Sequence, residues 1–340
     1  MYEKKMSGIY NEPEAYGNGY RFTYMKGLEK LIEQRKDECA KTRKKFTAQI
    51  TENTEEYRKK YLDMLGWPLN EEKKPILSVT ENKIFENEEC VFYRMQFEIF
   101  ADYKFYGILL KHKTEKALPL VISQHGGQGT PEVCSSFFDS ENYNDMSMRI
   151  FSRGVNVFAP QMLLWNKERF GPDNKRTDID NILKQLGGSI AALEIYSISR
   201  CLDYFEQQPY CNKSFGMAGL SYGGFYTLYT AAAETRIKSA LASSHFNDRT
   251  VYNWYDKVWK GAALNFLDPQ VALLVSPRFL RIEVGDNDEL FDAGLATEEF
   301  EIVRDNYKPS ENVQFNVFKG VHEFCPEEKG IEEMISILDF

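Results

Sequence analysis

The chain has 340 residues, 43% of them hydrophobic, and a formal net charge of −9. This length allows one large α/β domain with an appendage. The negative charge argues against nucleic acid as a partner, because no surplus of basic side chains is available to neutralise phosphates. Apolar runs reach only strand length, so we expect no membrane-spanning segment and no association with a membrane.

The cellular compartment is indicated by the first residues and by the cysteines. The chain starts with polar and charged residues rather than with the apolar segment of a signal peptide. Its six cysteines are scattered, with no Cys-x-x-Cys pair, which is typical of reduced thiols in a chain this long. We therefore expect a cytoplasmic protein without a disulfide framework or a metal site.

The first 75 residues have the pattern of an N-terminal helical extension. Residues 1–20 mix glycine, proline and tyrosine and are expected to form an irregular arm. A charged helix is predicted over 22–46 and a second one over 54–65, where Gly66 and Pro68 give a stop signal. These helices are candidates for the contacts of a homo-oligomer.

From residue 76 onward strands alternate with helices. An antiparallel hairpin is predicted first, and the segment 160–187 is expected to be a polar loop. An insertion over 243–275 is rich in aromatic residues, and its helical spacing indicates a helical insertion. The predicted strands are 91–100, 105–111, 118–123, 155–159, 214–220, 237–242, 279–284 and 313–318. This order predicts an α/β domain over 76–340, with a mostly parallel sheet and helices on both faces.

One short motif stands at the centre of this domain. Gly219-Leu220-Ser221-Tyr222-Gly223 follows a predicted strand and precedes a predicted helix. The strand–turn–helix context of Gly-x-Ser-x-Gly is that of a nucleophile elbow, whose sharp turn needs small neighbours and exposes the serine hydroxyl. Ser221 is therefore the candidate nucleophile.

A serine nucleophile needs a base, and the base needs an acid that orients it. Downstream of Ser221 the histidines are His245 and His322, and His322 follows the last predicted strand, where such folds place their ligands. We predict His322 as the base.

Three aspartates are candidates for the acid. Asp288 is preferred because of its place in Gly-x-x-Asp-x-x-Phe, after the predicted strand 279–284, which lies between Ser221 and His322 in the chain. Asp286 is expected to cap the turn, as Asp beside Gly often does. Asp248 is the third candidate, because some elbow enzymes take their acid from the preceding strand.

The oxyanion hole needs two backbone N–H donors. One is expected from Tyr222, the residue after the nucleophile. The second is assigned to Gly127, with Gln128 as the alternative, in the glycine-rich loop after strand 118–123. The candidates for lining the substrate pocket are His125, Gln128, Trp165, His245 and Trp254; His125 is also expected to brace its loop, and the tryptophans are equally suited to a hydrophobic core.

These motifs together resemble those of the α/β-hydrolases. They are Gln124-His125-Gly126-Gly127, Gly219 to Gly224, Gly285 to Asp288 and Gly320-Val321-His322. The lead-in Tyr57 to Leu69 is similar to that of acetyl xylan esterase-like and dienelactone hydrolase-like members, although dienelactone hydrolases use a cysteine nucleophile.

The resemblance implies an ester hydrolase with no metal or organic cofactor, acting on a small-molecule or oligosaccharide ester such as an acetylated carbohydrate. Two alternatives remain open. One is a peptidase or aminoacyl hydrolase similar to the prolyl oligopeptidase group, whose propeller is missing here. The other is an inactive hydrolase fold used as a binding module.

Overall fold

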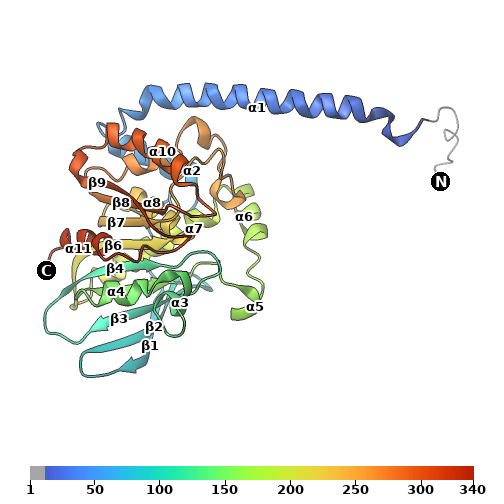
Figure 1. Ribbon diagram of the computed structural model, residues 1–340. Helices are drawn as coiled ribbons and strands as arrows, with labels where there is room; N and C mark the ends of the chain where they lie inside the picture. Colours follow the sequence, from blue (N-terminus) through green and yellow to red (C-terminus); the bar gives the residue numbers. More distant parts are fainter. Residues whose placement is uncertain (1–11) are drawn as a thin grey trace, which may run out of the picture.

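A computed structural model describes residues 12–340 of the chain. Its central element is a nine-stranded sheet in the order β1-β2-β3-β5-β4-β6-β7-β8-β9 (Figure 1). Strand β2 pairs antiparallel with both β1 and β3, and β3 pairs antiparallel with β5. All pairs from β5 to β9 are parallel. The strands are β1 Ser78–Glu86, β2 Cys90–Phe100, β3 Tyr103–His112, β4 Leu118–Gln124, β5 Asn156–Pro160, β6 Cys211–Leu220, β7 Ile237–Ser243, β8 Phe279–Gly285 and β9 Val313–Phe318.

Helices cover both faces of the sheet and enclose two hydrophobic cores. The larger core includes side chains of α2, α7, α8, α9 and α10, and the smaller one side chains of α3, α4 and α11. The helices are α1 Asn18–Thr47, α2 Thr54–Leu65, α3 Pro131–Cys134, α4 Met146–Phe151, α5 Lys167–Phe170, α6 Arg176–Gln185, α7 Ile190–Phe205, α8 Tyr222–Ala233, α9 Asp268–Leu273, α10 Ala293–Asn306 and α11 Lys329–Ser336. The described residues also contain five 3-10 turns: η1 Glu14–Gly17, η2 Glu141–Tyr143, η3 Tyr255–Lys257, η4 Ala262–Leu264 and η5 Ser310–Asn312.

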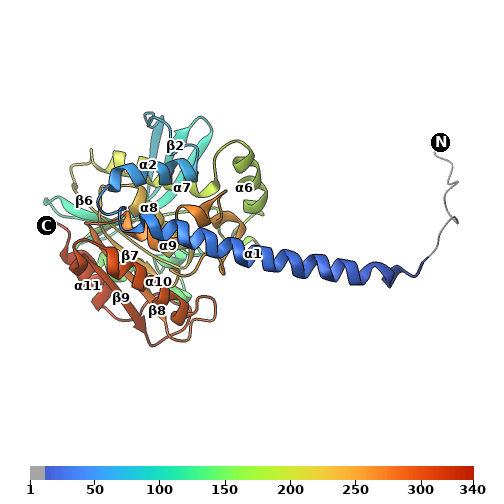
Figure 2. The same cartoon turned by 90° about the horizontal axis from the view of Figure 1, so that it is seen from above.

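The two N-terminal helices relate differently to the rest of the molecule. Helix α2 joins the larger core through Tyr57, Tyr61 and Leu65. Helix α1 runs across the body only with its C-terminal part and otherwise projects away from it (Figure 2). The predicted irregular arm, residues 1–20, lies partly outside the described residues, and from Glu14 onward the chain is already helical.

Two predicted segments differ in the structure. The segment 160–187 contains α5 and α6, although a loop was expected. Helix α6 escapes a search for apolar periodicity because its buried residues are Arg176 and Asp180. The insertion 243–275 is mostly irregular rather than helical, with the turns η3 and η4 before α9. Of its aromatic residues at helical spacing, Trp259 packs on α8 and Tyr252 packs on Phe291, so the spacing does not mark a helix.

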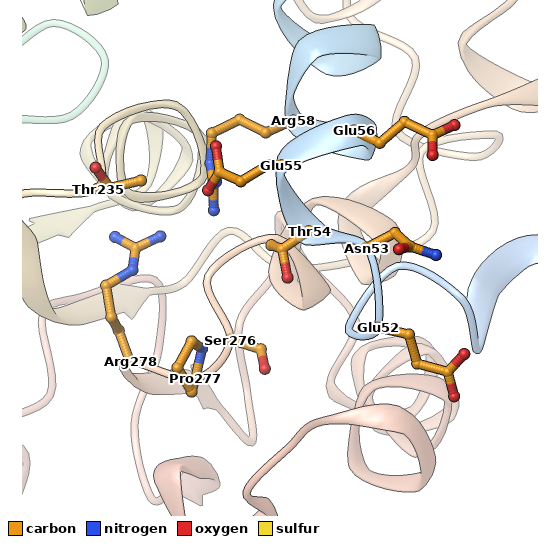
Figure 3. Close-up of a pocket in the computed structure, with 10 residues that line it drawn as sticks. All are labelled: Glu52, Asn53, Thr54, Glu55, Glu56, Arg58, Thr235, Ser276, Pro277 and Arg278. Atoms are coloured by element: carbon orange, nitrogen blue, oxygen red, sulfur yellow. The ribbon is translucent and has the colours of Figure 1, made fainter.

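A cavity of about 570 Å³ lies at the amino ends of β7 and β8. Figure 3 shows Arg58 of α2 and Arg278, which precedes β8, pointing their guanidinium groups toward one another across it. Arg58 donates to the carbonyls of Ala232 and Leu274, at 2.8 Å each. Arg278 donates to the carbonyl of Ala231 at 2.7 Å. The two arginines thus hold carbonyls at the C-terminal end of α8, at the sheet edge opposite to the one where Ser221 lies.

Candidate active site

Ser221 stands between β6 and α8 in a strained backbone conformation. Its φ is 58° and its ψ −119°, a region that residues with a side chain rarely adopt. The turn is sterically closed: a Cβ at Gly219 would lie 2.4 Å from the carbonyl carbon of Gly223, and one at Gly223 would lie 2.0 Å from the carbonyl oxygen of Gln124. Only glycine fits these two positions, which explains the motif around the serine.

His322 lies in the loop after β9 and contacts Asp288. Its Nδ1 is 2.9 Å from Oδ2 and 3.1 Å from Oδ1 of Asp288. The buried carboxylate also accepts the backbone N–H groups of Leu290 and Phe291 at 2.9 and 3.0 Å. Burial alone would raise the pKa of Asp288, but His322 and these two N–H groups outweigh it and hold that pKa below its usual value. Asp288 is therefore an anion that orients the imidazole.

The other two candidate acids have different partners. Oδ1 of Asp286 accepts the N–H of Gly320 at 3.1 Å and so holds the loop that carries His322. Asp248 accepts the N–H and the hydroxyl of Thr250 within its own turn. Among residues 12–340, neither of these carboxylates is hydrogen-bonded to His322.

Ser221 and His322 line the same cavity, which has a volume of about 400 Å³. It opens at the carboxyl ends of the parallel strands, and the segments 160–187 and 243–275 both contribute to its walls. Its lining residues are Gly126, Gly127, Gln128, Asn142, Tyr143, Leu163, Leu164, Trp165, Asn174, Arg176, Leu220, Ser221, Tyr222, Trp254, Tyr255, Leu290 and His322.

Two neighbouring backbone N–H groups at this cavity are of interest because they have no acceptor within residues 12–340. The neighbouring amides are engaged: Gly126 donates to the Tyr143 hydroxyl at 2.9 Å, and Gln128 donates to the Leu164 carbonyl at 2.6 Å. Within the described part of the chain, the N–H groups of Gly127 and Tyr222 have no acceptor. The two residues are adjacent, because a Cβ at Gly127 would lie 3.3 Å from Cδ2 of Tyr222. Donors of this kind can bind an oxyanion, and Gln128 is not available for it.

The five candidates for the substrate pocket separate into two groups. Gln128, Trp165 and Trp254 line the cavity. His125 and His245 are fully buried and do not line it. Nε2 of His125 accepts the Met162 N–H at 2.9 Å, and burial lowers the pKa of His125 to about 4. Burial and the charge of Arg249 lower the pKa of His245 well below its usual value. Both histidines are therefore neutral structural groups.

The aromatic residues of the insertion also divide. Trp254 and Tyr255 line the cavity, whereas the Trp259 ring stacks on Phe225 and Tyr229 of α8. The insertion therefore supplies one wall of the cavity and also packs onto the core.

A buried chain of polar groups holds the Tyr222 side chain. Its hydroxyl donates to Oδ1 of Asp256 at 3.0 Å, and Nε of Arg176 donates to Oδ2 of Asp256 at 2.6 Å. The Trp254 ring stacks on the Tyr222 ring at 5.4 Å, and Nζ of Lys257 lies 3.8 Å from the centre of that ring. Sequence reasoning missed Arg176 and Asp256, because no motif marks them and they meet only in the fold.

The described residues contain no group of three or more His, Cys, Asp or Glu side chains suited to hold a metal ion. None of the helices within residues 12–340 is both long and apolar enough to cross a membrane.

Comparisons with known proteins agree on the architecture. The model of the X-Pro dipeptidyl-peptidase (S15) family matches residues 188–276, which include Ser221 but are less than half of the chain. No curated protein sequence matches the chain.

Three solved structures illustrate the likeness of fold. A proposed acetyl xylan esterase of Bacteroides fragilis is 13% identical, with a TM-score of 0.65 over 84% of this chain and 81% of that one. Acetyl xylan esterase 1 of Thermoanaerobacterium sp. JW/SL YS485 is 14% identical, with a TM-score of 0.59 over 84% and 94%. A glucuronoyl esterase of Solibacter usitatus is 11% identical, with a TM-score of 0.59 over 81% and 90%. At such identities the likeness establishes the fold alone, and the chain has the α/β-hydrolase fold.

Proposed function

We propose that this protein is a serine esterase that hydrolyses small acyl esters, with acetyl groups on carbohydrates as its substrate class. The observation that supports the proposal most is the composition of one cavity. A strained serine, an imidazole hydrogen-bonded to a buried carboxylate and two unpartnered N–H groups all belong to it. These are the groups that acyl transfer through serine requires.

In the proposed mechanism the Ser221 hydroxyl attacks the ester carbonyl while Nε2 of His322 takes its proton. Asp288 holds the proton on Nδ1 and stabilises the imidazolium that forms. The N–H groups of Gly127 and Tyr222 bind the tetrahedral oxyanion. His322 then gives its proton to the leaving alcohol, and water attacks the acyl-enzyme by the same route to release the acid and restore Ser221.

The cavity walls support a carbohydrate ester as the substrate. Trp165, Trp254 and Tyr255 offer flat apolar faces, and Gln128, Asn142 and Asn174 offer amide donors and acceptors for hydroxyl groups. A volume of about 400 Å³ lies within the range of small-molecule sites. One structure with the same fold is described as an acetyl xylan esterase, and another as a proposed one.

A peptidase is the second candidate, because the matching family model describes X-Pro dipeptidyl-peptidases. A free peptide N-terminus carries a positive charge and needs a carboxylate to bind it. The cavity lining contains no Asp or Glu side chain within residues 12–340. Its one arginine, Arg176, is paired with Asp256 and Glu194. These features favour the neutral ester over the peptide.

The proposal is tested by measuring hydrolysis of 4-nitrophenyl acetate and of an alanyl 4-nitroanilide side by side. We expect acetate turnover that Ser221→Ala lowers about a million-fold in kcat, while the exposed Ser310→Ala variant stays at the wild-type rate. A screen of acetylated sugars then identifies the alcohol. Turnover of the anilide alone would replace the esterase with the peptidase, and turnover of neither substrate would favour a fold that only binds.

A further inference from the structure

Helix α1 is seated on the body only at its C-terminal end. Cys39 and Thr47 are buried there, and Phe46 stacks on Tyr57 and contacts Phe266 edge-on. Arg43 donates to the carbonyl of Ala263. The rest of the helix extends beyond the edge of the body in both views (Figures 1 and 2).

The projecting part of α1 carries an exposed apolar face. Spacings of four, four and three residues place its members along one side of the helix. Each side chain in this face is between 43% and 83% exposed. The face consists of Tyr20, Tyr24, Met25, Leu28, Leu31 and Ile32.

This face continues the one by which α1 packs on the body. Met25, Ile32, Cys39 and Phe46 follow one another at intervals of seven residues, which keeps them on the same side of a helix. The last two are covered by the body, whereas the first two are exposed. The row is therefore apolar both where the body covers it and where it is exposed to solvent. This pattern is expected when a second surface covers the exposed half of the helix.

The charges on the projecting part limit what that second surface can be. Residues 18–38 carry five basic and four acidic side chains, a net charge of +1. Three of the basic side chains already pair with acidic ones on the helix: Lys26 with Glu29, Arg35 with Glu38, and Lys36 with Glu33. A helix that lies on an anionic membrane is rich in unpaired Lys and Arg, so a neutral, apolar partner fits better.

We propose that this apolar face of α1 binds the same face of a second copy of the chain. A two-fold axis brings identical faces together and closes the assembly, so that no apolar surface is left over. At about 200 Å² for an aromatic side chain, the face exposes on the order of 500 Å² per chain. Two such faces together approach the lower end of stable interfaces, about 1,200 Å² in total.

Sedimentation velocity of the full chain between about 1 and 100 μM tests this proposal, a range that resolves dissociation constants typical of small interfaces. We expect the wild type to sediment with twice the mass of the chain at the upper end. Tyr24→Ala with Leu31→Ala is expected to shift it to the mass of one chain. Alanine is the best helix former, so circular dichroism should show the helix retained. The matched control is Lys26→Ala with Lys30→Ala, outside the apolar face, which should leave the dimer intact.

Three outcomes would overturn the proposal. The first is a wild type that stays monomeric over the whole range. The second is a dimer that persists unchanged in the Tyr24/Leu31 variant, because the contact would then lie elsewhere. The third is sedimentation of the wild-type chain with vesicles of phosphatidylcholine and phosphatidylserine, abolished by the same variant, which would assign the face to a membrane. Ester hydrolysis is not affected by any of these results, so the fate of the proposed function is separate.

Discussion

At its N-terminal end α8 begins directly after Ser221, and the N–H of Tyr222 there has no acceptor among the described residues. At its C-terminal end the carbonyls of Ala231 and Ala232 are held by Arg278 and Arg58. A helix carries partial positive charge at its N-terminus and partial negative charge at its C-terminus. The C-terminal end, which we call the closed end of α8, is thus neutralised by permanent cations. The N-terminal end, which we call the open end, keeps the Tyr222 N–H free, and the proposed mechanism uses this donor to bind the oxyanion.

The comparison also separates the two cavities by the state of their hydrogen-bond donors. The cavity of Figure 3 is lined by two arginines, but four of the N–H donors of Arg278 go to backbone carbonyls. Burial, and then the charge of Arg58, lower the pKa of Arg278 to about 10. The cavity at Ser221 instead has donors without acceptors. We therefore identify the candidate active site by its free N–H donors beside the strained Ser221, and not by the size of its cavity.

The largest effect of a substitution at the open end, after loss of Ser221, is expected from Asp288→Asn. Without the carboxylate the His322 tautomer is no longer fixed, and kcat for 4-nitrophenyl acetate should fall about ten-thousand-fold. Asp286→Asn is the matched control: an asparagine oxygen can still accept the Gly320 N–H, so kcat should stay within about threefold. A larger loss in the Asp286 variant would reverse the two roles.

At the closed end, Arg58→Met is expected to lower stability without changing kcat. The substitution removes the donor for the buried carbonyl of Ala232 and leaves it unsatisfied, whereas the carbonyl of Leu274 keeps its hydrogen bond from Arg278 at 3.3 Å. We expect the free energy of unfolding to fall by about 2 kcal/mol, measured by urea denaturation. Lys59→Met, an exposed neighbour on α2, should be nearly neutral. A loss of kcat in Arg58→Met at full folding would contradict the separation of the two ends.

The loop that contains Gly127 also contains His125, which predicts how the stability of the protein depends on pH. His125 has its pKa lowered to about 4 by burial, against about 6.5 when unfolded. Between these two pH values the unfolded state binds a proton at His125 that the folded state does not bind. The stability contributed by neutral His125 is therefore complete above pH 6.5 and is lost as the pH falls toward 4. The loss is on the order of 3 kcal/mol.

Urea denaturation of wild type and His125→Gln at pH 7 and pH 4.5 measures the contribution of His125 to the pH dependence of stability. The stability of the variant should depend less on pH than that of the wild type, because glutamine does not titrate. His112→Gln serves as the control at a half-buried position. Identical pH dependence in wild type and His125→Gln would show that His125 is not the titrating group.

The smallest effect is expected from Tyr222→Phe, which removes the hydroxyl that Asp256 binds. The backbone N–H of Tyr222 stays in place but its side chain loses one anchor, so we expect kcat to fall about tenfold at unchanged KM. Tyr255→Phe, in the same cavity wall, should change kcat by less than about twofold. An equal change in both variants would remove the proposed link between Asp256 and the oxyanion hole.

Most of the fold could be predicted from the sequence, because local patterns determine it. The hairpin of β2 and β3, the parallel strands and the helix Thr54–Leu65 lie where apolar periodicity and stop signals put them. Helix α6 was not predicted, because Arg176 and Asp180 occupy its buried face and no apolar stripe marks it.

Only those residues of the candidate site that belong to a sequence motif could be predicted. Ser221 and the loops of Gly127, Asp288 and His322 each follow a strand, so they gather at one edge of the sheet. The buried pair of Arg176 and Asp256 spans 80 positions of the chain. The two residues are brought together by the packing of the insertion on α8, and no local sequence pattern indicates this packing.

Labelling with a fluorophosphonate, followed by intact-mass and peptide mass spectrometry, tests the central claim most directly. We predict one adduct per chain, located on Ser221, absent in Ser221→Ala and retained in Ser310→Ala. Prior incubation with an ester substrate should slow the labelling. A protein that hydrolyses 4-nitrophenyl acetate but carries no adduct, or carries it on another residue, would contradict the assignment of the open end of α8 as the catalytic site.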